Sequence, residues 1–212
     1  MSEGAKEVVA QACKQAFHIL ALYYDFDTYP NFKPFLYENA QTSQNCGKVF
    51  FDHIKETDEL YIGLNFGKDF YQEHKRFNLN EFAIIAEETS HFKLLIDAFQ
   101  QQTKVTRLNL EMLGEIDRFI VLMHSCFIDL PFTFEPYWKN LHELCDIFFQ
   151  GQRFPHEPEP LYFDAETLAL YHLQQAFFSQ WDNTYVDFQK ISYQGKQYLK
   201  KLRQQILNHS IL

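Results

Sequence analysis

Apolar residues recur at steps of three and four along most of the chain, the spacing that gathers them on one face of an α-helix. This pattern predicts helices over residues 3–24, 79–101, 106–125, 137–150, 164–180 and 193–208. The helix over 79–101 has the clearest beginning, because Asn78 and Glu81 have the spacing of a capping box. Only a short break near residue 103 separates it from the next helix, so we expect the two to form an antiparallel helical hairpin.

A different pattern, with a period of two, runs over residues 60–66. Apolar Leu60, Ile62, Leu64 and Phe66 alternate there with Tyr61, Gly63 and Asn65, as in a half-buried β-strand. A polar turn over 55–59 separates this run from the apolar residues 49–51, so residues 48–66 are expected to form an antiparallel β-hairpin. Because an isolated hairpin is only marginally stable, this one should pack on the helices or pair with a further strand.

Prolines and small polar residues mark the connections. Residues 25–45 are expected to form a long connection, and residues 151–159 a second loop. The chain shows no internal repeat and no inter-domain linker. We therefore expect a single domain over residues 1–212, of the mainly α (α+β) class. Five or six helices should surround the central helical hairpin at about 79–125, with the β-hairpin at about 48–66 packed on them.

The composition is that of a folded chain with many aromatic rings. Of the 212 residues, 46% are hydrophobic and 22% are charged, as in ordinary globular proteins. There are 23 Phe and 12 Tyr against 7 Gly and 7 Pro, which indicates a large core built from long regular elements. With so many rings some must lie at the surface, and an exposed aromatic patch would mark binding of a partner protein or a small apolar ligand.

The charge of the chain argues against some classes of partner. The formal net charge is −9, with a pI near 5.4. Nucleic-acid binding is not expected, because its affinity comes largely from Lys and Arg that neutralise phosphates. Anionic membrane surfaces are disfavoured for the same reason. One short basic stretch, expected to be a solvated helix face, consists of Lys196, Lys200, Lys201 and Arg203.

The expected location is the cytoplasm. No apolar stretch approaches the roughly 20 residues that a membrane-spanning helix needs. The first residues lack the basic and apolar regions of a secretory signal. The cysteines are widely spaced and include no C-x-x-C pair, so we expect reduced thiols at Cys13, Cys46, Cys126 and Cys145.

Familiar catalytic, nucleotide-binding and calcium-binding motifs are absent from the sequence. One predicted helix nevertheless carries an unusual carboxylate. On the helix over 79–101 the apolar residues form one continuous arc, and Glu88 lies inside it. His91 lies on the border of the arc, whereas Glu87 lies about 100° away from Glu88 and is expected to face water. Because a buried carboxylate without a partner is costly, Glu88 must find a cation, a hydrogen-bond donor or a metal ion.

The next predicted helix offers partners for these groups. There Glu115 lies within the apolar arc and Arg118 lies at its edge. In an antiparallel hairpin that turns near residue 103, His91 would lie level with Glu115. In the same register, Glu88 would lie level with Arg118. We therefore expect two polar pairs to meet across the hairpin.

Two interpretations of this cluster remain open. In the first it is a buried polar network that fixes the register of the hairpin and consists of Glu88, His91, Glu115 and Arg118. In the second, Glu88, His91 and Glu115 bind one Fe, Mn or Zn ion. Glu88 and His91 form an E-x-x-H sequence, which resembles one quarter of a ferritin-like di-iron site. The chain holds no second E-x-x-H, so a complete di-iron centre is not expected.

The sequence therefore supports two functional hypotheses. The first is a non-catalytic cytosolic protein without a cofactor, which binds a partner protein or an apolar ligand through an exposed aromatic surface. The alternative is a metal-dependent or acid–base enzyme whose site on the central helical hairpin comprises Glu88, His91 and Glu115. A contiguous pocket lined by these three residues would favour the enzyme. A closed cluster beside exposed aromatic residues would favour the binding protein.

Overall fold

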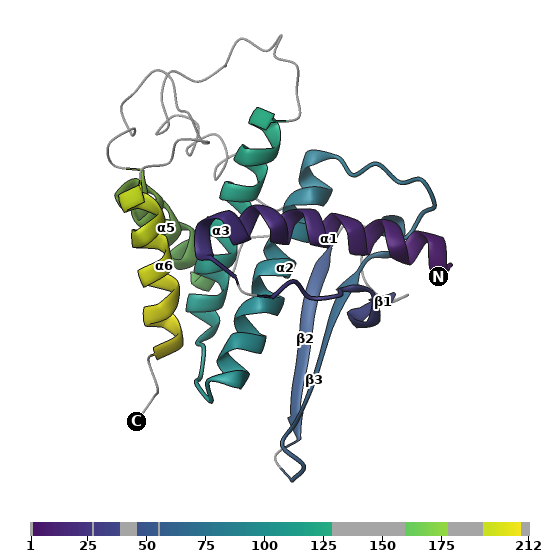
Figure 1. The fold of residues 1–212 in the computed structure, drawn as a ribbon, viewed down its shortest axis with the longest axis horizontal. Coiled ribbons are helices and arrows are strands. Elements are labelled where there is room, and N and C mark those ends of the chain that lie inside the picture. The colour runs from purple at the N-terminus through teal and green to yellow at the C-terminus, as the bar shows by residue number, and fades with distance from the viewer. Residues whose placement is uncertain are drawn as a thin grey trace.

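The computed structural model describes residues 2–26, 28–38, 46–54, 56–128, 160–177 and 193–208. This part of the chain contains five α-helices: α1 (Glu3–Tyr24), α2 (Leu79–Gln100), α3 (Arg107–Ile128), α5 (Pro160–Ala176) and α6 (Tyr193–Asn208) (Figure 1). Their bounds lie close to those expected from the apolar spacing, and the mainly α class with a small sheet is confirmed. The expected helix over 137–150 and the loop over 151–159 lie outside the described residues.

Helices α2 and α3 form the expected helical hairpin, side by side and antiparallel (Figure 1). At the start of α2, Asn78 Oδ1 accepts a hydrogen bond from Glu81 N–H, and the Glu81 carboxylate accepts one from Asn78 N–H. The capping box is therefore confirmed. Just after α2, Gln102 adopts a positive φ of 54°, a left-handed conformation that turns the chain toward α3.

A three-stranded sheet packs beside α2. It consists of β1 (Leu36–Glu38), β2 (Gly47–Ile54) and β3 (Glu59–Phe66), in the order β1-β3-β2. Strands β2 and β3 form the expected antiparallel hairpin, in which Val49 lies opposite Leu64. The hairpin both packs on α2 and pairs with a further strand, as its marginal stability in isolation requires.

Strand β1 corrects one expectation. Residues 36–38 were expected within the connection over 25–45, but they pair with β3 in a parallel arrangement. Leu36 lies opposite Leu64 and is buried, directly after the 3-10 turn η1 (Lys33–Phe35). Three residues are too few to show a period of two, so this strand is determined by its pairing with β3 rather than by a local pattern.

Helix α2 has neighbours on several sides. Helix α1 crosses α2 and α3, and the sheet lies along another side of α2 (Figure 1). On the far side of α3 lies α5, and α6 packs against α5 and α1. Buried residues accordingly occur around most of α2, including Phe82, Ile85, Thr89 and Leu94. A helix placed in this way buries more than the single face that an amphipathic pattern describes.

Arg203 attaches α6 to the core. Its guanidinium is buried, donates a hydrogen bond of 3.2 Å to Asp97 of α2 and lies 3.8 Å from Asp117 of α3. The same group lies over the rings of Tyr24 and Phe26, in cation–π geometry. The expectation of a solvated basic face is therefore wrong at Arg203, because the tertiary fold brings Asp97 and the buried Asp117 to this position.

Asp117 is the fully buried carboxylate of this group. It accepts hydrogen bonds from the hydroxyl groups of Tyr24 in α1 and Ser90 in α2. Burial raises the pKa of Asp117, while Arg203 and the two hydroxyl groups oppose that rise. A single carboxylate on α3 thus holds α1, α2 and α6 together.

Replacing Arg203 with Met is expected to lower the free energy of unfolding by about 3–5 kcal/mol, the usual cost of removing one partner of a buried ion pair. Met keeps an apolar stem but leaves Asp117 without its cation. The measurement is urea unfolding at neutral pH. Lys201→Met, on the exposed side of the same helix, is the matched control and should change stability by less than about 0.5 kcal/mol. Equal losses in the two variants would contradict this role of Arg203.

Candidate metal centre

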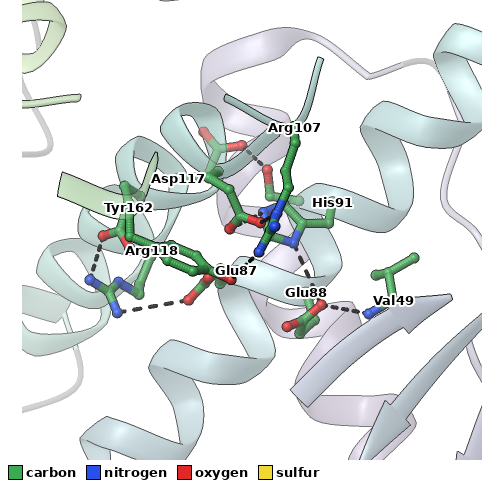
Figure 2. A network of polar contacts seen from close by, with 11 residues as sticks. Val49, Glu87, Glu88, His91, Arg107, Asp117, Arg118 and Tyr162 are labelled. Atoms are coloured by element: carbon green, nitrogen blue, oxygen red, sulfur yellow. Dashed lines mark hydrogen bonds and ion pairs between the residues drawn. The ribbon is translucent and has the colours of Figure 1, made fainter. Parts of the chain in front are cut away.

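Two facing helices supply the polar cluster at the centre of the fold (Figure 2). From α2 come Glu87, Glu88 and His91, and from α3 come Glu111, Glu115 and Arg118. Within each helix these residues lie mostly three or four positions apart, so their side chains share one side of the helix. The two sides meet because α2 and α3 pack antiparallel.

The four residues expected in the network all lie in the interior: Glu88, His91, Glu115 and Arg118 are between 3% and 8% exposed. Glu87 was expected to face water, but only 18% of its side chain is exposed and it contacts Arg118. That expectation is wrong because it treats α2 as having one buried side. Since α1, α3 and the sheet all pack on α2, a second arc of this helix is buried as well.

Arg118 has different partners from the one expected. It hydrogen bonds to Glu115, one turn earlier on α3. Its Nη1 also lies 3.7 Å from Glu87 Oε2 on α2, so the link between the helices runs through Glu87 rather than through Glu88. A carboxylate one turn away on the same helix can pair with a cation as well as one on the facing helix can. The expected register considered only pairs between the two helices.

His91 likewise differs from its expected pairing with Glu115. Its Nδ1 lies 3.5 Å from Glu88 Oε2, one turn earlier on α2, and its Nε2 lies 3.9 Å from Glu111 Oε2 on α3. Gly114 makes room for the ring, because an added Cβ there would lie 2.4 Å from His91 Nε2. A glycine inside a helix costs about 1 kcal/mol relative to Ala, so Gly114 is a sequence signal for close approach that the search for polar partners missed.

Glu88 connects the cluster to the sheet. Its Oε2 accepts a hydrogen bond of 2.8 Å from the backbone N–H of Val49 in β2 (Figure 2). At Gly47 in the same strand, an added Cβ would lie 2.7 Å from Glu88 Cγ and 2.6 Å from Ile84, so glycine permits this close approach. No sequence periodicity relates Glu88 to a backbone group 39 residues away.

The charges around His91 favour its protonated form. Burial by itself lowers the pKa of His91, but the hydrogen bond and charge of Glu88, with the charges of Glu87 and Glu111, raise it to about 9. Burial also raises the pKa of Glu111, and the charges of Glu87 and Glu88 raise it further, while those of His91 and Arg107 oppose the rise. The carboxylates therefore repel one another and attract a cation.

Glu115 belongs to the side of the cluster that holds Arg118. Burial raises the pKa of Glu115 to about 8, although the charge of Arg118 beside it opposes the rise. The charges of Glu87 on α2 and Glu166 on α5 act in the same direction as burial. A proton or the guanidinium of Arg118 thus compensates this carboxylate.

Three side chains lie close enough together that they could hold a metal ion. Glu87, Glu88 and His91 each offer one ligand atom, and these atoms all lie within 4.8 Å of one another. This group contains Glu87, whereas the sequence suggested Glu115 as the third ligand. Two carboxylates and one imidazole form a donor set that suits Mn, Fe or Zn. Within the described residues, the buried Nε2 of His91 has no hydrogen-bond partner.

Comparison with known proteins gives no family assignment: no protein-family model matches the chain, and no curated protein or solved structure is significantly similar to it. In the part of the chain that the structure describes, no helix has both the length and the apolar character needed to cross a membrane. Function is therefore inferred from the chemistry of the cluster and of the molecular surface.

The free energy of unfolding of the metal-free protein is expected to fall as the pH rises from 6.5 to 9. The pKa of His91 is raised from 6.5 to about 9 in the folded protein, so the protonated ring stabilises the fold fully below pH 6.5. This contribution, about 3 kcal/mol, is lost as the pH rises through the folded pKa. Urea unfolding at a series of pH values measures it. His91→Gln should remove this part of the pH dependence and His53→Gln should not, whereas an unchanged slope in His91→Gln would refute the assignment.

Proposed function

We propose that the protein binds one divalent transition-metal ion, of the Mn, Fe or Zn class, between α2 and α3. Glu87, Glu88 and His91 supply the ligands. The observation that supports this proposal most directly is the approach of their donor atoms to within 4.8 Å of one another. The buried His91 Nε2, which lacks a hydrogen-bond partner among the described residues, supports it independently. A centre of this kind would suit a metal-dependent or acid–base enzyme.

The charges around the site favour a cation. The carboxylates of Glu87, Glu88 and Glu111 surround His91, and their repulsion is relieved by the His91 proton and by Arg118. His91 must lose this proton to act as a ligand, because only the neutral imidazole offers a lone pair to a metal. A divalent ion would replace one positive charge with two at the point where the carboxylates converge.

We propose Glu111 as the group that transfers a proton beside this centre. Its Oε2 lies 3.9 Å from His91 Nε2, and its side chain is 12% exposed. Burial raises the pKa of Glu111, and a carboxyl group with a raised pKa can accept or donate a proton closer to neutral pH. We therefore assign an acid–base role to Glu111 rather than to Glu115, which is bound to Arg118.

Elemental analysis of protein purified without chelator or metal-affinity steps is expected to find about one equivalent of Mn, Fe or Zn. Removing the metal should lower the thermal midpoint, and adding it back should restore the midpoint by mass action. Glu87→Gln and Glu88→Gln should each lose both the metal and this thermal response, because each removes one ligand charge.

Glu115→Gln is the matched control, since it changes a buried carboxylate of the same hairpin that is outside the ligand group. It should retain the metal. A wild-type protein without metal, whose thermal midpoint ignores chelator, Zn²⁺ and Mn²⁺, would contradict the proposal. Loss of metal from Glu115→Gln but not from Glu87→Gln would instead support the ligand set expected from the sequence.

We also propose that the outer face of the sheet binds a partner protein through exposed aromatic residues. Tyr37, Phe50 and Tyr61, one from each strand, are between 39% and 54% exposed. The rings of Tyr37 and Phe50 lie 5.3 Å apart over Gly63, where an added Cβ would lie 2.3 Å from Phe50 Cζ. We call Tyr37, Phe50 and Tyr61 the aromatic face.

Carboxylates border the aromatic face. Asp52 lies opposite Tyr61 in the strand register, so the two side chains share a face of the sheet. Glu59 accepts a hydrogen bond of 3.4 Å from the Tyr61 hydroxyl. A protein that presents Arg or Lys among apolar side chains fits this surface, because cations stack on aromatic rings and pair with carboxylates.

A photo-reactive phenylalanine analogue in place of Tyr61 is expected to crosslink one recurrent basic protein in cell extract. The yield should fall several-fold in about 0.5 M salt, which screens exposed charges, and after Phe50→Ala. The same analogue in place of Tyr171, which is equally exposed on α5, is the control. Identical crosslinks from both positions, or a yield insensitive to salt and to Phe50→Ala, would rule out this role for the aromatic face.

A further inference from the structure

A surface groove runs beside α1, away from the metal ligands and from the aromatic face. It is formed by α1, by Tyr29 and by the C-terminal part of α3, and its volume is about 480 Å³. That volume falls within the range of small-molecule sites. The lining includes the polar residues Lys14, His18 and Ser125 and the apolar or aromatic residues Ile19, Leu22 and Tyr29.

The lining of the groove carries a lysine and no negative charge, although the protein is acidic. It contains one lysine and two histidines and no carboxylate, in a chain with 28 acidic residues and a net charge of −9. Lys33, Lys75 and Lys93 each lie within ion-pair distance of a carboxylate. Lys14 has no such partner among the described residues, so its charge is available to an anion in the groove.

Ser125 gives the groove a second polar group. Its Oγ is buried and, within the part of the chain that the structure describes, forms no hydrogen bond. A buried hydroxyl without a partner is destabilising. His18, in the same lining, has its Nδ1 3.4 Å from the Tyr29 hydroxyl, which holds the two rings beside each other.

The same groove offers apolar surface for the rest of a ligand. Ile19 is buried, whereas Leu22 is 42% and Tyr29 is 51% exposed. Lys14 and Leu22 lie about 12 Å apart along the axis of α1. A ligand that lies along the helix can therefore place an anionic group at Lys14 and an apolar chain over Leu22.

We propose that this groove binds a small amphipathic carboxylate, with its anionic group near Lys14 and its apolar chain over Leu22 and Tyr29. The charge of the lining selects an anion, and the exposed apolar side chains favour an organic ligand over an inorganic one. The groove shares no residue with the metal ligands, so this proposal does not depend on the metal centre.

Calorimetric titration of the full-length protein with octanoate, octanol and octylammonium, which have the same chain length, tests the proposal. Octanoate should saturate one site and bind at least about tenfold more tightly than the other two. Lys14→Glu should weaken octanoate binding about tenfold or more, and Leu22→Ser several-fold. Both substitutions lie at surface positions of α1, so circular dichroism should be unchanged. Lys201→Glu, the same change of charge on the exposed side of α6, should bind octanoate as the wild type does.

Equal affinities for octanoate and octanol, no saturable octanoate binding, or an unchanged affinity in Lys14→Glu would overturn the proposal. Proton–nitrogen correlation spectra test where on the protein octanoate binds. Octanoate should shift the amide signals of Lys14, His18 and Ser125, and shifts confined to the sheet would also overturn the proposal. Octanoate should bind with the same affinity in the presence of a metal chelator, so failure here is distinguishable from failure of the metal centre.

Discussion

The fold depends on a layer of buried charge between α2 and α3. Removing a charged side chain from water costs several kcal/mol, and only close partners offset that cost. Here Glu88 is held by the backbone of β2 and by His91, while Arg118 is held by carboxylates of both helices. These contacts join the sheet to the helical hairpin. The buried Asp117, with Arg203 beside it, attaches α1 and α6 in the same way.

The same charge layer gives the protein a chemistry that an apolar core would lack. The proton on His91 balances part of the charge of the surrounding carboxylates and so stabilises the metal-free protein. In the proposed metal centre, a divalent ion takes the place of that proton among the same groups. Stability and metal binding would then be two consequences of one arrangement. The aromatic face and the groove beside α1 are independent of this layer, since they depend on exposed rings and on the charge of Lys14.

The helices and the β-hairpin could be predicted from periodicity, because each repeats its apolar pattern several times. The burial of Glu88 could be predicted too, since its place within the apolar arc of α2 requires no knowledge of its partner. The burial of Glu87 could not be predicted, because an apolar arc describes one buried side and α2 has neighbours on several sides. The hydrogen bond from Val49 to Glu88 and the strand β1 could not be predicted either, because contacts between segments distant in sequence determine both. Gly114 carried a signal whose meaning depends on the facing His91.

Calorimetric titration of the metal-free protein with Zn²⁺ at pH 7, in two buffers with different enthalpies of ionisation, tests the central claim that a metal ion replaces the proton of His91. Because the pKa of His91 is about 9, nearly every molecule carries this proton at pH 7. The predicted result is one bound ion and the release of about one proton per ion. No saturable binding, or binding with the same heat in both buffers and hence without proton release, would contradict it.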